Sequence, residues 1–141
     1  MDVGNTKGLL AVKVILNAIC LISVLSGLNV IFGGAMAIPG VSAVEASIDN
    51  ELRFFAVYRL AYGVFSFWVT RNLSERYNFL PSIAVVFFLS GVARLLSIIF
   101  VGDPIFMFIP VMFIELLLPF VIYYLYIKLK NQLFVDKGEM T

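Results

Sequence analysis

Long uncharged apolar runs decide which fold this chain can adopt. Residues 14–32 read VILNAICLISVLSGLNVIF and contain no charged side chain, and about 20 residues of helix are enough to cross a bilayer. Three similar runs follow, so we predict membrane spans at about residues 9–35, 52–70, 79–101 and 105–127. The sequence therefore predicts an all-α integral membrane protein, a single domain over residues 1–141 built as a four-helix up-and-down bundle.

The composition agrees with a membrane protein. Of the 141 residues, 62% are hydrophobic and 13% are charged, and the net charge is +1. No basic or acidic tail is long enough to bind nucleic acid. The chain has no histidine, and its one cysteine, Cys20, lies in an apolar run where it reads as a packing residue. We therefore expect no metal site, no cofactor and no nucleic-acid partner.

Basic residues flank alternate ends of the predicted spans. Cytoplasmic flanks of membrane helices are enriched in lysine and arginine, and the segments 36–51 and 102–104 contain neither. Both termini and the middle loop are therefore predicted to be cytoplasmic. The residues that carry this prediction are Lys7, Lys13, Arg71, Arg76, Lys128, Lys130 and Lys137. A signal peptide cleaved near AMA at 35–37 is the competing interpretation, but its uncharged run would be unusually long.

The connections between spans are predicted to be short, apart from the first. GDP at 102–104 predicts an antiparallel hairpin of the last two helices. RNLSERYN at 71–78 predicts a second tight link. The longer loop at 36–51 runs into SIDNEL, which predicts Ser47 or Asp49 as the N-cap of the second span.

Three charged residues lie deep inside the predicted spans: Arg59, Arg94 and Glu115. Each is unfavourable by about 2.5–3.5 kcal/mol near the centre of a membrane helix, unless it is paired or reaches water. Helical side chains lean toward the N-terminus of their own helix, which closes the offset of about one turn between Arg94 and Glu115. We predict that these two residues pair and that Arg59 lies just above them, toward the outer surface.

Small and polar residues recur on one face of three predicted spans, where they let membrane helices approach closely. They are Ser23, Ser26, Gly27 and Gly33 in the first span, Gly63, Ser66 and Thr70 beside Arg59 in the second, and Ser90, Gly91 and Ser97 beside Arg94 in the third. In the fourth span, proline lacks the N–H that would bond to residue i−4. Pro119 is therefore predicted to free the carbonyl of Glu115, and Pro110 that of Phe106.

Two interpretations of the charges stay open. In the first, Arg59 and Arg94 bind a carboxylate, a phosphate or an anionic lipid headgroup, and Glu115 orients one of them. The mouth of this pocket is then formed by Asp49, Glu51 and a snorkelling Arg53. In the second, the pair of Arg94 and Glu115 fixes helix packing in a structural or accessory protein of an envelope complex. No second acid and no activated nucleophile accompanies Glu115, so we do not expect an enzyme.

The same residues resemble a known bacterial family, the domain of unknown function 4345. The resemblance covers about residues 25–127. The residues that carry it are Asp49, Glu51, Leu52, Arg53 and Phe54, then Ala61 and Gly63, then Gly91, Arg94, Ser97, Gly102 and Pro104, and finally Glu115 and Pro119. The resemblance implies a small multi-pass protein of the bacterial inner membrane with four helices, and it implies no established activity.

Overall fold

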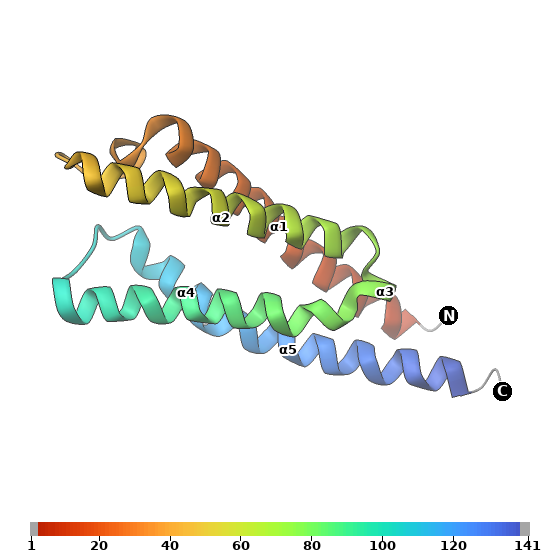
Figure 1. Cartoon of the computed structure of the whole chain (residues 1–141). Helices are drawn as coiled ribbons and strands as arrows, with labels where there is room; N and C mark the ends of the chain where they lie inside the picture. Colours follow the sequence, from red (N-terminus) through yellow and green to blue (C-terminus); the bar gives the residue numbers. More distant parts are fainter. Residues whose placement is uncertain (1–2, 139–141) are drawn as a thin grey trace. The chain divides into compact units, whose positions relative to one another are not determined.

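The computed structural model describes residues 3–138, with side chains for residues 8–131, and every regular element in this part of the chain is helical. The long helices are α1 (Val3–Gly33), α2 (Ala46–Arg71), α4 (Leu80–Val101) and α5 (Phe108–Gly138), shown in Figure 1. The short helical elements are α3 (Leu73–Arg76), η1 (Ala35–Ala37) and η2 (Tyr77–Phe79). The predicted all-α class is confirmed. Lys7 and Lys137 lie outside the residues whose side chains are described.

Three of the described helical segments are long and apolar enough to cross a membrane. They are Gly8–Gly33, Leu73–Val101 and Phe108–Asn131, which correspond to the first, third and fourth predicted spans. α2 is long enough at 26 residues, but its three arginines and two acidic residues make it less apolar. The passage of α2 through the bilayer therefore stays a prediction.

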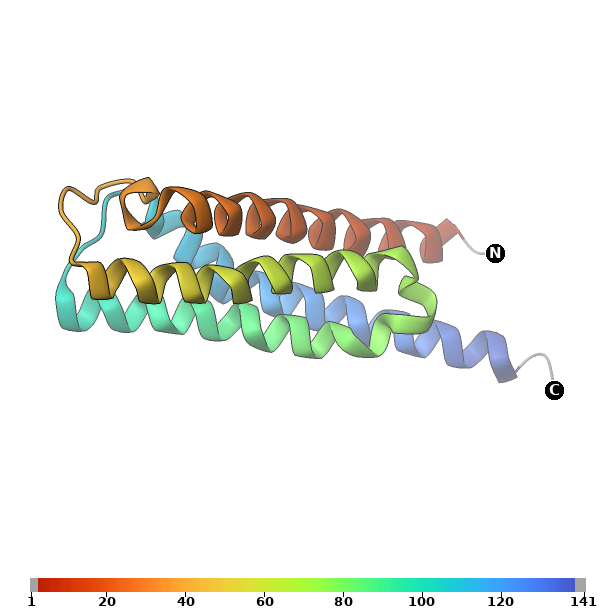
Figure 2. The same ribbon diagram turned by 45° about the horizontal axis from the view of Figure 1, so that its top comes forward.

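The contacts divide the chain into two compact units, Val14–Arg71 and a second made of Met1–Lys13 with Asn72–Thr141. In the first unit, α1 and α2 run antiparallel and approach closely at two glycines (Figure 2). A Cβ atom on Gly27 would lie 3.1 Å from the carbonyl oxygen of Ala56, and one on Gly63 would lie 3.0 Å from the Cβ of Ser23. Small side chains therefore allow the two backbones to meet, as predicted.

The second unit is built on a hairpin of α4 and α5, which pack side by side in opposite directions (Figures 1 and 2). Gly91 on α4 meets Leu116 on α5. About one helical turn further along, the rings of Phe88 and Phe120 meet edge to face with centroids 5.8 Å apart. The predicted antiparallel hairpin is confirmed.

The predicted polar stripe on α4 is partly wrong. Ser66 and Thr70 on α2 are buried, but Ser90 and Ser97 on α4 are exposed. The hydroxyl of Ser90 donates to the carbonyl oxygen of Val86 in its own helix at 3.2 Å. A hydroxyl satisfied in this way does not need a partner on another helix, so periodicity alone overestimated how far this stripe faces protein.

The connection between α4 and α5 is longer than predicted, because it contains residues 102–107 rather than 102–104. Gly102 ends α4 with φ +120°, a conformation that favours glycine, and its N–H donates to the carbonyl oxygen of Ile98 at 3.2 Å. Pro104 disfavours helix at the residue before it. The N–H of Phe108 then donates to the carbonyl oxygen of Ile105 at 3.0 Å, which closes a turn into α5.

The two prolines of α5 differ in their effect on the backbone. Pro110 lies in the first turn, where a helix has no use for the missing N–H. The carbonyl oxygen of Phe106 accepts from the N–H of Ile109 at 3.2 Å, so the prediction that Pro110 frees this carbonyl is wrong. Pro119 lies inside the helix, where it removes the N–H that would otherwise bond to the carbonyl of Glu115.

Two further boundaries differ from the prediction. α2 begins at Ala46, so Ser47 and Asp49 lie inside the helix and neither is its N-cap. The carboxylate of Asp49 is bound elsewhere, as described below. The link predicted at 71–78 is itself helical, because α3 and η2 follow α2 after a single break at Asn72.

Gly91→Ala is expected to destabilise the hairpin. The added Cβ would lie 2.9 Å from Cγ of Leu116 and 3.0 Å from the backbone nitrogen of the same residue. Overpacking of this kind typically lowers the free energy of unfolding by about 1–3 kcal/mol, which thermal unfolding in a neutral detergent measures. Gly8→Ala is the matched control, because nothing lies within 4 Å of the place its Cβ would take and alanine is the better helix former. Equal melting temperatures for the two variants would contradict the close approach.

Candidate functional site

Arg94 on α4 and Glu115 on α5 form an ion pair across the hairpin. Nε of Arg94 donates to Oε2 of Glu115 at 2.7 Å. The side chain of Glu115 is 6% exposed and that of Arg94 is 28% exposed. The predicted pairing of these two residues is confirmed, and it satisfies two charges that apolar surroundings would otherwise leave without a partner.

Phe108, the first residue of α5, also contacts the guanidinium of Arg94. Cζ of Arg94 lies 5.5 Å from the centroid of the Phe108 ring, within the range of a cation–π contact. The hydrogen bond uses only Nε, and within the described part of the chain no protein acceptor bonds to the two Nη groups. Arg94 is therefore held by Glu115 and Phe108, and its two Nη groups are available to donate to a ligand.

A small cavity adjoins this arginine. It has a volume of about 80 Å³ and is lined by Arg94, Ser97, Ile98, Pro104, Phe108 and Met112. A water molecule in the liquid occupies about 30 Å³, so the cavity holds two or three waters or one group the size of a carboxylate or phosphate. The cavity lies where α4 ends and α5 begins, and the long connection at 102–107 supplies Pro104 to its wall.

Arg59, the third predicted site residue, lies on α2 in the other compact unit and is exposed. Arg59 is the fourteenth of the 26 residues of α2 and therefore lies near the middle of the helix. The approach of Arg59 to the pair of Arg94 and Glu115 stays a prediction. Glu51, predicted at the pocket mouth, is also exposed on α2.

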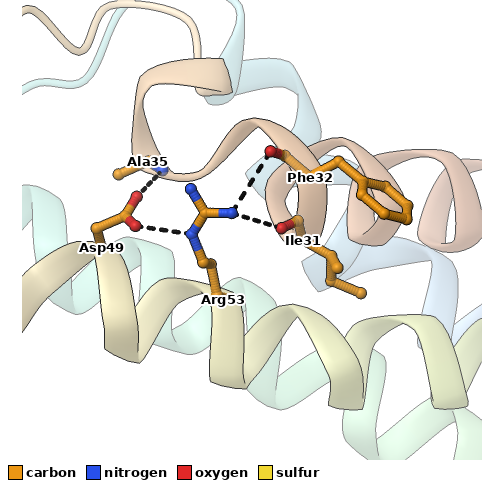
Figure 3. Close-up of polar contacts among 5 residues, drawn as sticks. All are labelled: Ile31, Phe32, Ala35, Asp49 and Arg53. Carbon is orange, nitrogen blue, oxygen red and sulfur yellow. Dashed lines mark hydrogen bonds and ion pairs between the residues drawn. The ribbon is translucent and has the colours of Figure 1, made fainter.

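A second charged cluster joins α1 to α2 in the first unit (Figure 3). Nε of Arg53 donates to Oδ2 of Asp49 at 2.7 Å, and the other carboxylate oxygen, Oδ1, accepts from the N–H of Ala35 at 2.7 Å. Nη1 of Arg53 donates to the carbonyl oxygen of Ile31 at 2.6 Å and to that of Phe32 at 3.4 Å. Arg53 thus binds the last carbonyls of α1, where a cation is favoured by the helix dipole.

Gly34 makes this cluster possible. Its φ of +66° and ψ of −164° lie in a region that essentially only glycine adopts, and its N–H donates to the carbonyl oxygen of Val30 at 2.8 Å. A Cβ at this position would collide with Arg53 and Asp49. These contacts were not predicted from the sequence, in which Arg53 was interpreted as a snorkelling residue at the mouth of the proposed pocket. The sequence did contain a signal for them. Gly34 follows an apolar helix, and Asp49 and Arg53 lie four residues apart further along the chain.

A larger groove lies at the other end of the hairpin and carries no charge. Its volume is about 280 Å³, and it is lined by Pro81, Ala84, Val85, Phe88, Pro119, Phe120 and Tyr123. Without a charged side chain in its lining, this groove offers nothing that would select an ion. The cavity beside Arg94 is therefore the better candidate for specific recognition.

One family of proteins is similar to this chain over most of its length. The family model described as "Domain of unknown function (DUF4345)" matches residues 11–126, which include Arg94, Glu115 and the whole lining of the cavity. No curated protein and no solved structure matches the chain. The resemblance found in the sequence is confirmed.

The interaction of Asp49 with the N–H of Ala35 in η1 is expected to be lost in acid. The Arg53 guanidinium, and to a smaller extent the Ala35 N–H, hold the pKa of Asp49 below its usual value. A lowered folded-state pKa stabilises the protein above the unfolded value of about 4, and this stabilisation disappears as the pH falls through the folded-state pKa. The amide proton chemical shift of Ala35, followed by NMR in detergent, should titrate with a midpoint below about 4. Asp49→Asn should abolish the titration, and a midpoint above that value would contradict the assignment.

Proposed function

The chain belongs to the DUF4345 family, and we propose that it is a small multi-pass inner-membrane protein that binds an anionic lipid or another small anionic ligand from the outer side. The observation that carries the proposal is the arrangement around Arg94. Glu115 holds Nε at 2.7 Å, and the cavity of about 80 Å³ adjoins the same side chain. A positioned guanidinium beside a small cavity is well suited to a carboxylate or phosphate.

The proposed topology places this cavity near the outer leaflet. All four long helices cross the membrane in up-and-down order, α2 included, with both termini and the α2–α4 link in the cytoplasm. Lys128 and Lys130 near the end of α5, with Arg71 and Arg76 in the link, supply the cytoplasmic positive charge. The connection at 102–107 then faces outward, and it contains Asp103 but no cation.

Arg59 is the proposed second donor. Arg59 and Arg94 are the two arginines deep inside the predicted spans, against one glutamate, and a guanidinium is a donor well suited to an anion. Such ionisable residues within membrane helices commonly mark functional sites. The proposal is binding rather than catalysis, because Glu115 is already engaged by Arg94 and the cavity lining holds no base that would activate the hydroxyl of Ser97.

A structural role is the alternative, and one observation favours it. Glu115 is 6% exposed at its side chain and bridges α4 to α5 through a single charged hydrogen bond. A buried pair of this kind can serve to fix the register of two helices without any ligand. In this alternative the protein is an accessory component of an envelope complex.

Native mass spectrometry of the gently solubilised protein tests the binding function. We expect a retained anionic molecule in the wild-type protein and its loss in Arg94→Gln and Arg59→Gln. Lys128→Gln is the matched control, because it removes one positive charge from the same hairpin outside the cavity. Retention of the same molecule by all three variants would contradict the proposal.

Stability measurements distinguish the structural alternative from the binding function. Removing one partner of a buried ion pair typically costs about 3–5 kcal/mol, whereas replacing both by apolar residues is often neutral. Arg94→Leu alone should therefore lower the melting temperature, and Arg94→Leu with Glu115→Met should restore it. If the restored double variant also retains the anionic molecule seen with the wild-type protein, the pair is structural and the proposed binding role is wrong.

A further inference from the structure

We infer that the ligand of the Arg94 cavity is an amphiphilic monoanion, recognised through one carboxylate or one phosphodiester group whose hydrocarbon lies outside the cavity. This inference rests on the proposed binding function and adds the chemical class of the ligand. Three features of the cavity lead to it: the free edge of the guanidinium, the charge already present, and the size and polarity of the walls.

The direction of approach is restricted by the contacts of Arg94. Nε is used by Glu115 at 2.7 Å, and Cζ lies over the Phe108 ring at 5.5 Å from its centroid. An incoming group is therefore left with the outer edge, where the two Nη groups present parallel N–H donors. Two oxygens on one atom match this edge in a bidentate contact, which both a carboxylate and a phosphodiester provide. Ser97, also in the lining, adds a hydroxyl donor.

The charge balance favours one negative charge over two. Arg94 contributes +1 and Glu115 contributes −1, so the pair has a sum of zero. The other lining side chains, from Ser97 to Met112, are uncharged. A dianion would leave two charges poorly compensated in surroundings of low dielectric constant, and the desolvation penalty rises steeply with charge. A monoanion leaves only one, and its two oxygens are both satisfied by the guanidinium edge.

The size and polarity of the walls place the rest of the ligand. A volume of about 80 Å³ admits the charged group alone. The walls beyond Arg94 and Ser97 are formed by Ile98, Pro104, Phe108 and Met112, which offer no hydrogen bonds from their side chains. A polar metabolite would place its hydroxyl or amide groups against these apolar side chains without partners. A hydrocarbon segment needs no hydrogen bonds there, and it continues into the lipid.

Ligand titration in dodecyl maltoside, a neutral detergent without phosphate, tests the inference by calorimetry on the full chain. Decanoate supplies a carboxylate on hydrocarbon, and dioctanoyl phosphatidylglycerol supplies a phosphodiester on hydrocarbon. Acetate lacks the hydrocarbon, and decyl phosphate at pH 8.5 carries about two charges. We expect binding of decanoate or of the phosphatidylglycerol that is at least about 10-fold tighter than that of acetate and decyl phosphate. The tighter of the two amphiphiles identifies the source of the charged group.

The variants connect this binding to the cavity. Arg94→Gln should weaken binding of the preferred amphiphile by about 10-fold or more. Ser97→Leu should weaken this binding to a similar extent, because the larger side chain fills the cavity. This variant leaves the ion pair intact, so it tests the cavity even if Arg94→Gln does not fold. Lys128→Gln should bind like the wild type. Binding of decyl phosphate or acetate that is as tight and equally sensitive to Ser97→Leu would overturn the monoanion inference while leaving the binding function standing. Equal binding of the amphiphile by the wild type and by Ser97→Leu would contradict both the monoanion inference and the proposed binding function.

Discussion

The ion pair between Arg94 and Glu115 is the contact on which the hairpin depends. Two charges placed on neighbouring apolar helices have few acceptable positions, because lipid offers neither of them a partner. Once Nε of Arg94 meets Oε2 of Glu115 at 2.7 Å, the register of α4 against α5 is set, and Gly91 comes to lie against Leu116. The same contact fixes Arg94 where its side chain lines the cavity together with Phe108.

The parts of this structure that sequence reasoning predicted are those governed by long-range apolarity and by charge. The long helices, the antiparallel hairpin and the pairing of Arg94 with Glu115 follow because burial in lipid allows few alternatives. The parts it missed depend on local backbone geometry. Asp49 was predicted to cap its own helix, but α2 begins earlier and the carboxylate binds the N–H of Ala35 instead. No propensity within residues 45–52 points to an acceptor role so far away in the sequence.

The candidate site was predictable in its charges but not in its walls. Arg94 and Glu115 stand out in the sequence because they interrupt apolar runs. Phe108, Ile98 and Met112 are ordinary apolar residues of a membrane helix, and nothing in their spacing shows that they surround an arginine. Their role depends on the connection at 102–107, which was predicted to be only half as long. Arg59 shows the opposite case, since its charge is evident and its convergence with the other two stays a prediction.

The proline inside α5 has a mechanical consequence for the hairpin. Pro119 leaves the carbonyl of Glu115 without its helical donor, so the residue whose side chain binds Arg94 lies at a point where α5 can bend. Bending there swings the C-terminal half of α5 relative to the half that begins at Phe108. The carboxylate of Glu115 and the bend point thus share one residue, so the contact with Arg94 depends on how straight α5 remains.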